Sequence, residues 1–328
     1  MKISTMTSLI EGMIMKKSTG YWLVQTAQGP FDCTLAAQLC AAARTGKASR
    51  SNGPVNEDQY AALGDRVQVR QTGTAQGVIE TILPRRNQFW RRAAQAKPGQ
   101  HAAGQVIAAN LDQVIPVFAA TDPAPHWNML DRYLVSAEAA GISAQIVISK
   151  LDLMEQLPVD EQAELEAALA DYRRIGYAVY KVSAYQQRGL EELHTLLQGR
   201  TSALLGKSGV GKTSLLNAVQ PGLGQRVSAV SAYTSKGRHT TTHLELFPLS
   251  GGGALLDTPG VREFGLWGVE DEDLAWYFPE MRPYLGQCRF GADCRHADEP
   301  GCAVRKAVMA GAISPRRYKS FMHLQDES

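Results

Sequence analysis

The chain has little net charge and no long apolar run. Its 34 basic and 32 acidic side chains give a formal charge of +2, which is too small to identify a nucleic-acid binder, although it can hide a basic face on one domain. Glu11, Lys16 and Lys17 interrupt the apolar N-terminal segment. This excludes a signal-peptide core, and nowhere does the chain offer the ~20 apolar residues of a membrane span. We therefore expect a cytoplasmic protein with no membrane partner.

Cysteine is also scarce. Five cysteines are an odd number, and three of them lie close to a histidine, so metal binding fits better than the disulfide framework of a secreted protein. Cys33 and Cys40 lie far from this group and are expected to be ordinary reduced thiols. By contrast, 328 residues with 44% hydrophobic side chains suffice for two or three domains with sizeable cores.

Three blocks follow one another along the chain. Residues 1–100 hold short strand-like segments without a long helical period, which predicts a small antiparallel barrel. These segments are 11–16, 21–26, 65–69 and 78–83. Residues 101–279 alternate between strands and helices, which predicts a parallel sheet covered on both faces. Residues 280–328 contain the clustered cysteines, followed by two predicted helices.

A phosphate-binding motif, GKSGVGKT, follows a predicted strand at 201–205 and opens a predicted helix. In this context, successive backbone N–H groups and the helix N-terminus cradle phosphates. Lys212 is predicted to reach the β- and γ-phosphates as a catalytic residue, and Thr213 to bind Mg²⁺. The nucleotide-binding residues predicted here are Gly206, Lys207, Ser208, Gly209, Val210, Gly211, Lys212, Thr213 and Ser214.

A second motif, SKLD, follows a predicted strand at 144–149. It consists of Ser149, Lys150, Leu151 and Asp152. A carboxylate at Asp152 can accept hydrogen bonds from both N1–H and the N2 amine of guanine, a donor pair that adenine lacks, while Lys150 would lie over the ring. Taken alone, the tetrapeptide also fits a strand followed by a charged turn. Ser183 and Ala184 match a second base-contacting loop, whose backbone N–H groups meet the guanine carbonyl.

A third motif, DTPG, follows a predicted strand at 254–256. Asp257 can hold Mg²⁺ through water, and the N–H of Gly260 can sense the γ-phosphate, which makes Gly260 a predicted catalytic residue. A basic, threonine-rich segment at 236–242 lies where a switch segment supplies a threonine to Mg²⁺. The candidates are Thr240, Thr241 and Thr242, and the sequence does not choose among them.

Val261 follows DTPG, at a position where many GTPases have a glutamine that orients water. Valine cannot do this, so slow intrinsic turnover is expected. His239 is the candidate catalytic helper, because its imidazole can orient or deprotonate water once its loop is ordered. The alternative is an exposed histidine that contacts RNA or nothing at all.

The order of the motifs indicates a circularly permuted GTPase, because SKLD precedes the phosphate loop, whereas in ordinary GTPases the base-reading motif comes later. The set SKLD, SA, GKSGVGKT, GRHTTTH and DTPGVREFGLW, in that order, resembles the RsgA/YjeQ family of circularly permuted, ribosome-dependent GTPases. The resemblance covers nearly the whole chain, including ANLDQV near Asn110 and the cysteine cluster.

The resemblance implies an OB-type, RNA-binding barrel at 1–100, a permuted P-loop GTPase domain at 101–279 and a zinc-binding helical domain at 280–328. It implies hydrolysis of GTP to GDP and phosphate with Mg²⁺, stimulated by the small ribosomal subunit and its rRNA during late maturation of that subunit. We expect a monomer. The alternatives are an RNA-binding adaptor with a structural or slowly hydrolysed nucleotide, and a small-molecule kinase, which would leave SKLD unexplained.

Two features depart from the family pattern. Ser149 stands where the family usually has asparagine, and a hydroxyl makes fewer of the bonds that tie the base-reading loop to the phosphate loop, which predicts weaker nucleotide binding with unchanged base specificity. The basic stretch common in the family's barrel is not evident, and Arg44, Lys47 and Arg50 are its candidate substitutes.

The predicted metal ligands are Cys288, Cys294, His296 and Cys302. Three thiolates and one imidazole within 15 residues can close a tetrahedral shell, which is typical of one structural zinc ion and leaves no open position for catalysis. Free buried cysteines are the alternative. The basic residues expected to be exposed on the two following helices, where they either contact the RNA backbone or are simply solvated, are Arg305, Lys306, Arg316, Arg317 and Lys319.

Overall fold

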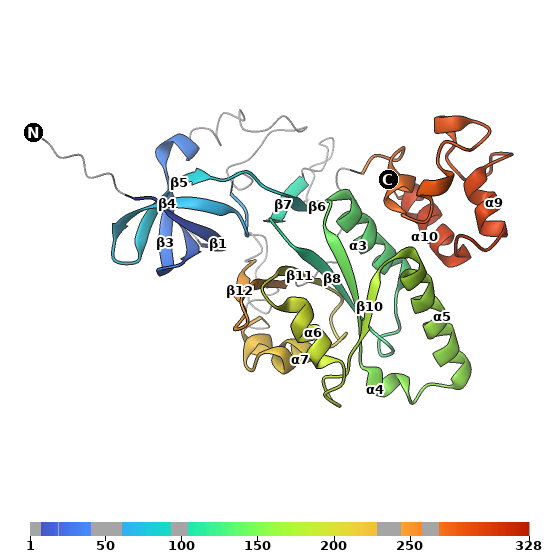
Figure 1. Ribbon diagram of the computed structural model, residues 1–328, viewed down its shortest axis with the longest axis horizontal. Coiled ribbons are helices and arrows are strands. Elements are labelled where there is room, and N and C mark those ends of the chain that lie inside the picture. The colour runs from blue at the N-terminus through green and yellow to red at the C-terminus, as the bar shows by residue number, and fades with distance from the viewer. Residues whose placement is uncertain are drawn as a thin grey trace, which may run out of the picture.

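The computed structural model describes residues 8–18, 20–40, 61–92, 104–227, 244–257 and 269–327. This part of the chain forms a barrel, a central sheet with helices, and a C-terminal group of short helices (Figure 1). None of the described helices is both long and apolar enough to cross a bilayer. The predictions that concern positions outside the described residues are those for Arg44, Lys47, Arg50, His239, Thr240, Thr241, Thr242, Gly260 and Val261.

Five strands close the N-terminal barrel in the order β1–β2–β3–β5–β4. They are β1 (Ile10–Ser18), β2 (Tyr21–Thr26), β3 (Gly29–Leu35), β4 (Arg66–Gly73) and β5 (Gln76–Ile82). Because β1 pairs with β4, the barrel has no free edge, and the parallel pair β3–β5 completes the topology of an OB fold. The barrel is therefore not purely antiparallel as predicted. Strand β3 was not predicted, because it begins with Gly29-Pro30, a pair that normally marks a turn.

The central sheet has six strands in the order β10–β9–β8–β11–β13–β12. Five of them run parallel, as predicted, whereas β12 pairs antiparallel with β13 at one edge. The strands are β8 (Gln113–Ala119), β9 (Ser143–Ser149), β10 (Ala178–Lys181), β11 (Thr201–Leu205), β12 (Leu246–Pro248) and β13 (Ala254–Asp257). Strand β12 was not predicted, since three residues are too few to show a period.

Helices cover both faces of this sheet. Their bounds are α3 (Trp127–Ala139), α5 (Val159–Ile175), α6 (Leu190–Leu197) and α7 (Lys212–Val219), with the short α4 (Leu151–Met154) directly after β9. Alternate residues of β8 show the two layers, because Val114 and Phe118 join the core with α3 and α5, whereas Ile115 and Val117 join the core with α6 and α7. The carboxyl ends of the strands thus project from a scaffold packed on both sides.

A polar junction joins the barrel to the sheet where the chain passes from one to the other. There β6 (Gln88–Arg92) pairs antiparallel with β7 (Gly104–Ala109), across the boundary predicted at residue 100. The side chain of Asn110 accepts from the N–H of Arg86 at 2.9 Å and donates to the carbonyl of Gly64 at 3.0 Å. The carboxylate of Asp112 accepts from Arg86 Nη2 and from the N–H of Thr201, each at 2.8 Å. Asp112 therefore connects the linker, residues 83–112 between the barrel and β8, directly to the first residue of β11.

The C-terminal domain contains α9 (Ala303–Met309), α10 (Pro315–Asp326) and three short 3-10 helices, η1 (Leu274–Tyr277), η2 (Arg282–Tyr284) and η3 (Gly291–Asp293). Its apolar core includes Phe278, Phe321 and Leu324, together with Val135 from α3. The domain therefore shares part of its core with the α/β domain.

Arg317 is buried, which contradicts the prediction of an exposed charge. Its side chain is 0% exposed, with Nη1 2.6 Å from Asp131 Oδ1 and Nε 2.6 Å from Glu280 Oε1. Arg316 is only partly exposed, and its guanidinium lies 4.7 Å from the ring centroid of Trp127. The helical period of α10 puts Arg317 on the same face as the buried Phe321 and Leu324. Its charge is compensated by two carboxylates that are distant in sequence but in direct contact with it. Arg317 therefore joins two domains and cannot contact RNA.

Replacing Arg317 with alanine is expected to lower the free energy of unfolding by about 3–5 kcal/mol, because Asp131 and Glu280 would stay buried without their counter-charge. Urea unfolding followed by circular dichroism measures the change. Lys319→Ala is the matched control, since Lys319 is exposed on the same helix, and its effect should stay within about 0.5 kcal/mol. Equal stability of the two variants would contradict the assigned role.

Candidate nucleotide and metal sites

The described parts of the predicted nucleotide motifs meet at the carboxyl ends of the parallel strands. Strand β11 leads into the phosphate loop, β9 leads into SKLD, and β13 ends at Asp257. Strand β8 lies between β9 and β11, so the base-reading motif and the phosphate loop are separated by one strand. Ligands of open α/β sheets bind at this edge.

The phosphate loop, residues 206–213, has a backbone path that only glycine allows at three positions. A Cβ on Gly206 would lie 2.5 Å from the carbonyl oxygen of Val117. Gly209 and Gly211 have φ values of +85° and +89°. Val210, between them, is buried and anchors the loop in the core. The loop thus curls tightly ahead of α7, which is the geometry that directs backbone N–H groups toward an anion.

Lys212 lies inside this loop. Its Nζ is 2.6 Å from the carbonyl oxygen of Gly206 and 3.2 Å from that of Lys207. Burial lowers the pKa of the Lys212 ammonium, while the carboxylate of Asp257 opposes this shift. A partly desolvated cation beside backbone N–H groups favours an anionic ligand such as a phosphate group.

Ser183 orients the carboxylate of Asp152. The Ser183 hydroxyl donates to Asp152 Oδ1 at 2.5 Å and accepts from the N–H of Gln186 at 3.0 Å. Two backbone hydrogen bonds of 3.0 Å between Ser183 and Arg188 hold the loop itself. The sequence predicted only a backbone role for Ser183. The hydrogen bond between its side chain and Asp152 could not be predicted, because the two residues are 31 positions apart and no motif connects them.

Lys150 has a left-handed backbone conformation, with φ of +56°, immediately before α4. Its Nζ contacts the carbonyl oxygen of Asp122 and lies 3.8 Å from the carboxylate of the same residue. The N–H of Leu151 donates to the carbonyl of Val182 at 3.1 Å, which ties SKLD to the end of β10, next to Ser183 and Ala184. Asp122, in the loop after β8, was not singled out from the sequence because it belongs to no motif.

Ser149 connects the base-reading motif to the phosphate loop. Its hydroxyl oxygen lies 2.5 Å from the carbonyl oxygen of Val210 and 3.1 Å from that of Phe118. A hydroxyl has one proton, so it donates to one of these carbonyls at a time, whereas the two N–H bonds of an asparagine amide can serve two acceptors. The link between the loops is therefore present with serine. Weaker nucleotide binding stays a prediction.

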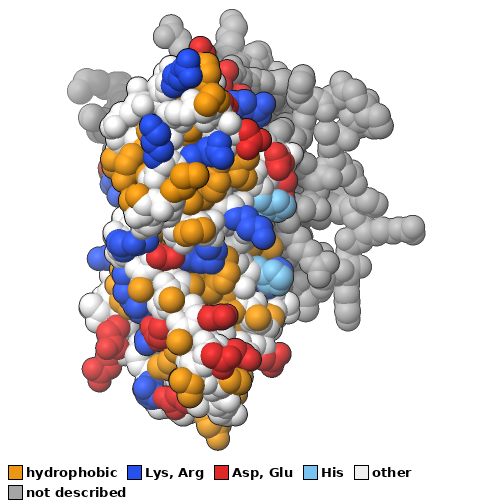
Figure 2. Space-filling view, turned by 90° about the vertical axis from the view of Figure 1, so that its right-hand side faces the viewer, with side chains coloured by type: hydrophobic (Ala, Val, Ile, Leu, Met, Phe, Trp, Pro, Cys, Tyr) orange, Lys and Arg blue, Asp and Glu red, His pale blue; other side chains and the backbone are white. Residues whose placement is uncertain are grey.

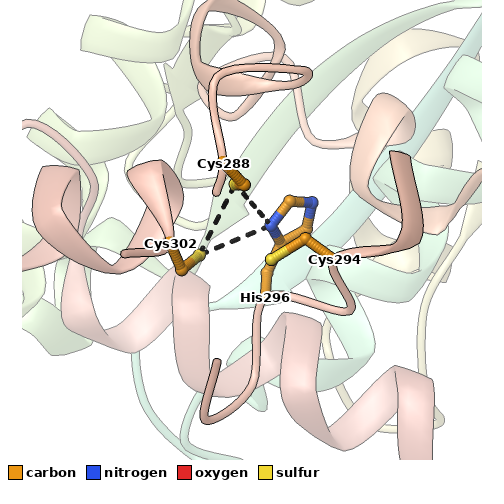
Figure 3. Close-up of side chains that lie close together, drawn as sticks. All are labelled: Cys288, Cys294, His296 and Cys302. Atoms are coloured by element: carbon orange, nitrogen blue, oxygen red, sulfur yellow. Dashed lines mark hydrogen bonds between the residues drawn. The ribbon is translucent and has the colours of Figure 1, made fainter. Parts of the chain in front are cut away.

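Cys288, Cys294, His296 and Cys302 converge in the C-terminal domain, buried and with their donor atoms within 4.8 Å of one another (Figure 3). The sulfur atoms of Cys288 and Cys302 are 3.8 Å apart, and His296 Nδ1 lies 3.5 Å from each of them. Tetrahedral zinc has bonds of about 2.3 Å to sulfur and about 2.0 Å to nitrogen. It therefore separates two sulfur ligands by roughly 3.8 Å, and a sulfur from a nitrogen ligand by roughly 3.5 Å. The donor set therefore fits a closed zinc shell.

Surrounding groups hold these ligands in place. The N–H of Ala303 donates to Cys288 Sγ at 3.3 Å, and that of Arg305 donates to Cys302 Sγ at 3.4 Å, at the start of α9. The Tyr318 hydroxyl donates to the carbonyl of His296 at 2.6 Å. Burial raises the pKa of the Cys294 thiol to about 12. Burial thus favours the neutral thiol, so a bound cation would have to stabilise the thiolate that zinc ligation requires.

Comparison with known proteins agrees with this geometry. The family model described as RsgA GTPase matches residues 82–267. The small ribosomal subunit biogenesis GTPase RsgA of Gemmatimonas aurantiaca is 45% identical over 325 residues, which cover 98% of each chain. The protein of the same name from Bacteroides fragilis is 36% identical over 321 residues, with 97% of each chain covered.

Two solved structures share the fold over nearly the full length. The crystal structure of YjeQ from Thermotoga maritima has a TM-score of 0.76 and 30% identity, with 98% of each chain covered. YloQ, described as a circularly permuted GTPase, has a TM-score of 0.69 and 28% identity, over 100% of this chain and 97% of its own. The motif order of this chain agrees with the description of YloQ as circularly permuted. The chain therefore belongs to the RsgA GTPase family, and it is a GTP hydrolase with a circularly permuted nucleotide-binding domain.

Proposed function

We propose that this GTPase binds the small ribosomal subunit and hydrolyses GTP to GDP and phosphate there, during late maturation of the subunit. The names of its relatives give the small subunit as their target. The observation that carries the proposal is the attachment of the GTPase domain, through buried polar contacts, to an OB barrel at Gly64 and to the Cys3His domain at Arg317. Contact with rRNA would stimulate turnover. The protein acts in the cytoplasm as a monomer.

In the proposed reaction the phosphate loop, from Gly206 to Ser214, holds the phosphate groups. Lys212 neutralises charge on the β- and γ-phosphates, and the Gly260 N–H senses the γ-phosphate. Thr213 and Asp257 would hold Mg²⁺, together with one of Thr240, Thr241 and Thr242. The positive charge of this ion would offset the negative charge that develops on the phosphate oxygens. Valine at 261 leaves the orientation of water to His239.

The base would be recognised by the SKLD loop. Asp152, held by the Ser183 hydroxyl, accepts from N1–H and the N2 amine of guanine, and the stem of Lys150 covers the ring. Ser149 and Leu151 position this loop against Val210 and Val182. The backbone of Ser183 and Ala184 meets the guanine carbonyl. Two loops that recognise one base are thereby fixed to each other and to the phosphate loop.

The Cys3His cluster would hold one structural zinc ion through Cys288, Cys294, His296 and Cys302. Four protein ligands leave no open coordination position, so the ion would take no part in catalysis. It would instead stabilise the fold of a domain that has few long helices.

Of the five basic residues predicted to be exposed on α9 and α10, Lys306 and Lys319 are exposed, and Arg305 and Arg316 are partly exposed. RNA contact by these two helices would therefore fall to these four residues. Figure 2 shows the face of the molecule on which this domain lies. Lys and Arg side chains are spread over its upper and middle parts among several Asp and Glu side chains, and Asp and Glu side chains gather over its lower part. The basic side chains of the upper and middle parts would favour contact with phosphate groups.

Measurement of GTP turnover with and without purified small subunits tests the proposed function. We expect turnover to rise with small subunits and to stay at the basal rate with large subunits. Subunit binding without faster turnover would instead favour the adaptor, in which the nucleotide is structural or only slowly hydrolysed. Absence of both binding and stimulation would contradict ribosome targeting.

Replacement of His239 with alanine is expected to leave GTP binding intact and to reduce subunit-stimulated hydrolysis by roughly 10²-fold, which is the lower range for loss of a general base. His194→Ala is the control, since His194 is exposed on α6. Single-turnover hydrolysis and equilibrium binding of GTP separate the two effects. Unchanged stimulated turnover in His239→Ala would remove the assigned role.

A further inference from the structure

Strand β1 turns from the barrel toward the edge of the central sheet. Met13 is the last residue of β1 that pairs with β4, and the register with β2 shifts between Ile14 and Lys16. Lys16 then forms an antiparallel bridge with Glu245, the residue that precedes β12. A bulge bends a strand and re-aims it. This bulge brings the barrel into backbone contact with the GTPase domain at a point far along the chain from the linker.

Side chains reinforce this backbone bridge. Lys16 Nζ lies 2.6 Å from Glu245 Oε2, and the two side chains are 35% and 19% exposed. Met15 and Leu246, the neighbours of the paired residues, are buried in the same apolar core, and Leu244 packs against it. The link is therefore a partly sheltered ion pair on an apolar base, which restrains position better than an isolated surface pair does.

One strand pair separates this bridge from Asp257, at the GTP site. Leu246 pairs with Leu256 in the antiparallel pair β12–β13, and Leu256 immediately precedes Asp257. Glu245 and one strand pair therefore form a continuous connection between Lys16 and the residue next to the carboxylate proposed for Mg²⁺. Glu245 also follows the threonine-rich segment 236–242 closely in sequence. Packed strands transmit displacements because they do not deform freely.

We propose that the Lys16–Glu245 link couples the barrel to the Mg²⁺ side of the GTP site, so that docking of the barrel on RNA accelerates hydrolysis. This rests on the proposed function, which supplies the RNA. Lys16 and Glu245 are positioning residues, since they act through β12 and β13. They set the degree of stimulation rather than the basal chemistry.

Charge reversal with a compensating swap tests the coupling. Lys16→Glu and Glu245→Lys should each lower subunit-stimulated kcat by about fivefold, at the low end of coupling between sites, with basal turnover and subunit affinity unchanged. The double variant Lys16→Glu with Glu245→Lys restores opposite charges and should regain most of the stimulation. Failure of the swap to restore stimulation, or stimulation intact in both single variants, overturns the coupling.

Glu11→Lys is the matched control. Glu11 lies on the same strand and pairs with Arg66 Nη2 at 3.2 Å, but that pair stays within the barrel, with both side chains about 60% exposed. It should keep full stimulation. If Lys16→Glu loses stimulation only in proportion to lost subunit affinity, Lys16 is an RNA contact and the coupling is wrong.

A measurement without subunits separates this proposal from the proposed function. Hydrogen–deuterium exchange of peptides covering 244–248 and 254–257 should be faster in Lys16→Glu than in Glu11→Lys, because the barrel no longer restrains β12. Equal exchange in the two variants overturns the coupling. If the unmodified protein shows no stimulation by small subunits, the proposed function fails, and the exchange result still decides whether the barrel restrains the GTP site.

Discussion

Asp152→Asn is expected to reverse the base preference of this GTPase, from guanosine to xanthosine triphosphate. The ratio of the two kcat/KM values should change by roughly 10⁴-fold, which is typical of sites that hydrogen-bond a polar group of the substrate. Guanine presents two donors to the carboxylate of Asp152. Xanthine has a carbonyl at C2, which accepts from the amide of asparagine and leaves N1–H for the amide oxygen.

The hydroxyl of Ser183 makes this exchange geometrically specific. It donates to one oxygen of Asp152 at 2.5 Å, so in the asparagine variant the amide oxygen takes that position and the nitrogen takes the other. Combining Asp152→Asn with Ser183→Ala should therefore weaken the gain for xanthosine triphosphate, because the amide can then rotate.

Asp122→Asn is the matched control for the base preference. The same chemical change is made on a neighbouring loop, at a carboxylate that is 88% exposed and touches Lys150. This variant should keep its preference for GTP. Competition between the two triphosphates in a turnover assay measures both variants. Retained GTP preference in Asp152→Asn would falsify the assignment of SKLD as the base reader.

Loss of zinc is expected to unfold the C-terminal domain locally and to leave basal GTP hydrolysis in place. Zinc binding in small domains contributes on the order of 10 kcal/mol, far more than any single contact of a domain of this size. Cys302→Ser removes a ligand that also caps α9, where its sulfur accepts from the N–H of Arg305. The purified variant should contain less than about a tenth of the zinc of the unmodified protein.

Cys40→Ser is the control for this prediction, because Cys40 is a partly buried thiol outside the cluster. It should retain about one zinc ion per chain, since a tetrahedral shell needs only the four clustered donors. Elemental analysis gives the zinc content, and hydrogen exchange over residues 288–309 reports local unfolding. Full zinc content in Cys302→Ser, or a similar loss in Cys40→Ser, would contradict the ligand set.

Local patterns carried most of what was predicted correctly. The glycines of the phosphate loop and the buried runs before it and before SKLD each act within a few residues, so the chain itself displays their effect. The predicted bounds of β9, β11 and β13 agree with the structure to within one residue, and the parallel arrangement of these strands brings SKLD, the phosphate loop and Asp257 to one edge. The closeness of these motifs was thus predictable without knowledge of any contact.

Pairings between distant residues were not predictable in the same way. Arginine side chains are usually exposed, and the burial of Arg317 is possible only because other segments supply the carboxylates of Asp131 and Glu280. The contact of Lys150 with Asp122 and that of Lys16 with Glu245 likewise join segments that no motif connects. Charge and hydropathy describe a side chain alone, whereas burial depends on the partner that the fold brings to it.

The burial of Arg317 restricts how this architecture can evolve. Helix α10 contacts the metal-binding loop through Tyr318 and α3 through Arg317. A recombination event that separated the nucleotide-binding domain from residues after 279 would leave Asp131 with an uncompensated charge in the interior of the recipient protein. A hybrid made from two relatives should therefore fold only if its crossover lies on the N-terminal side of α3 or carries both partners together.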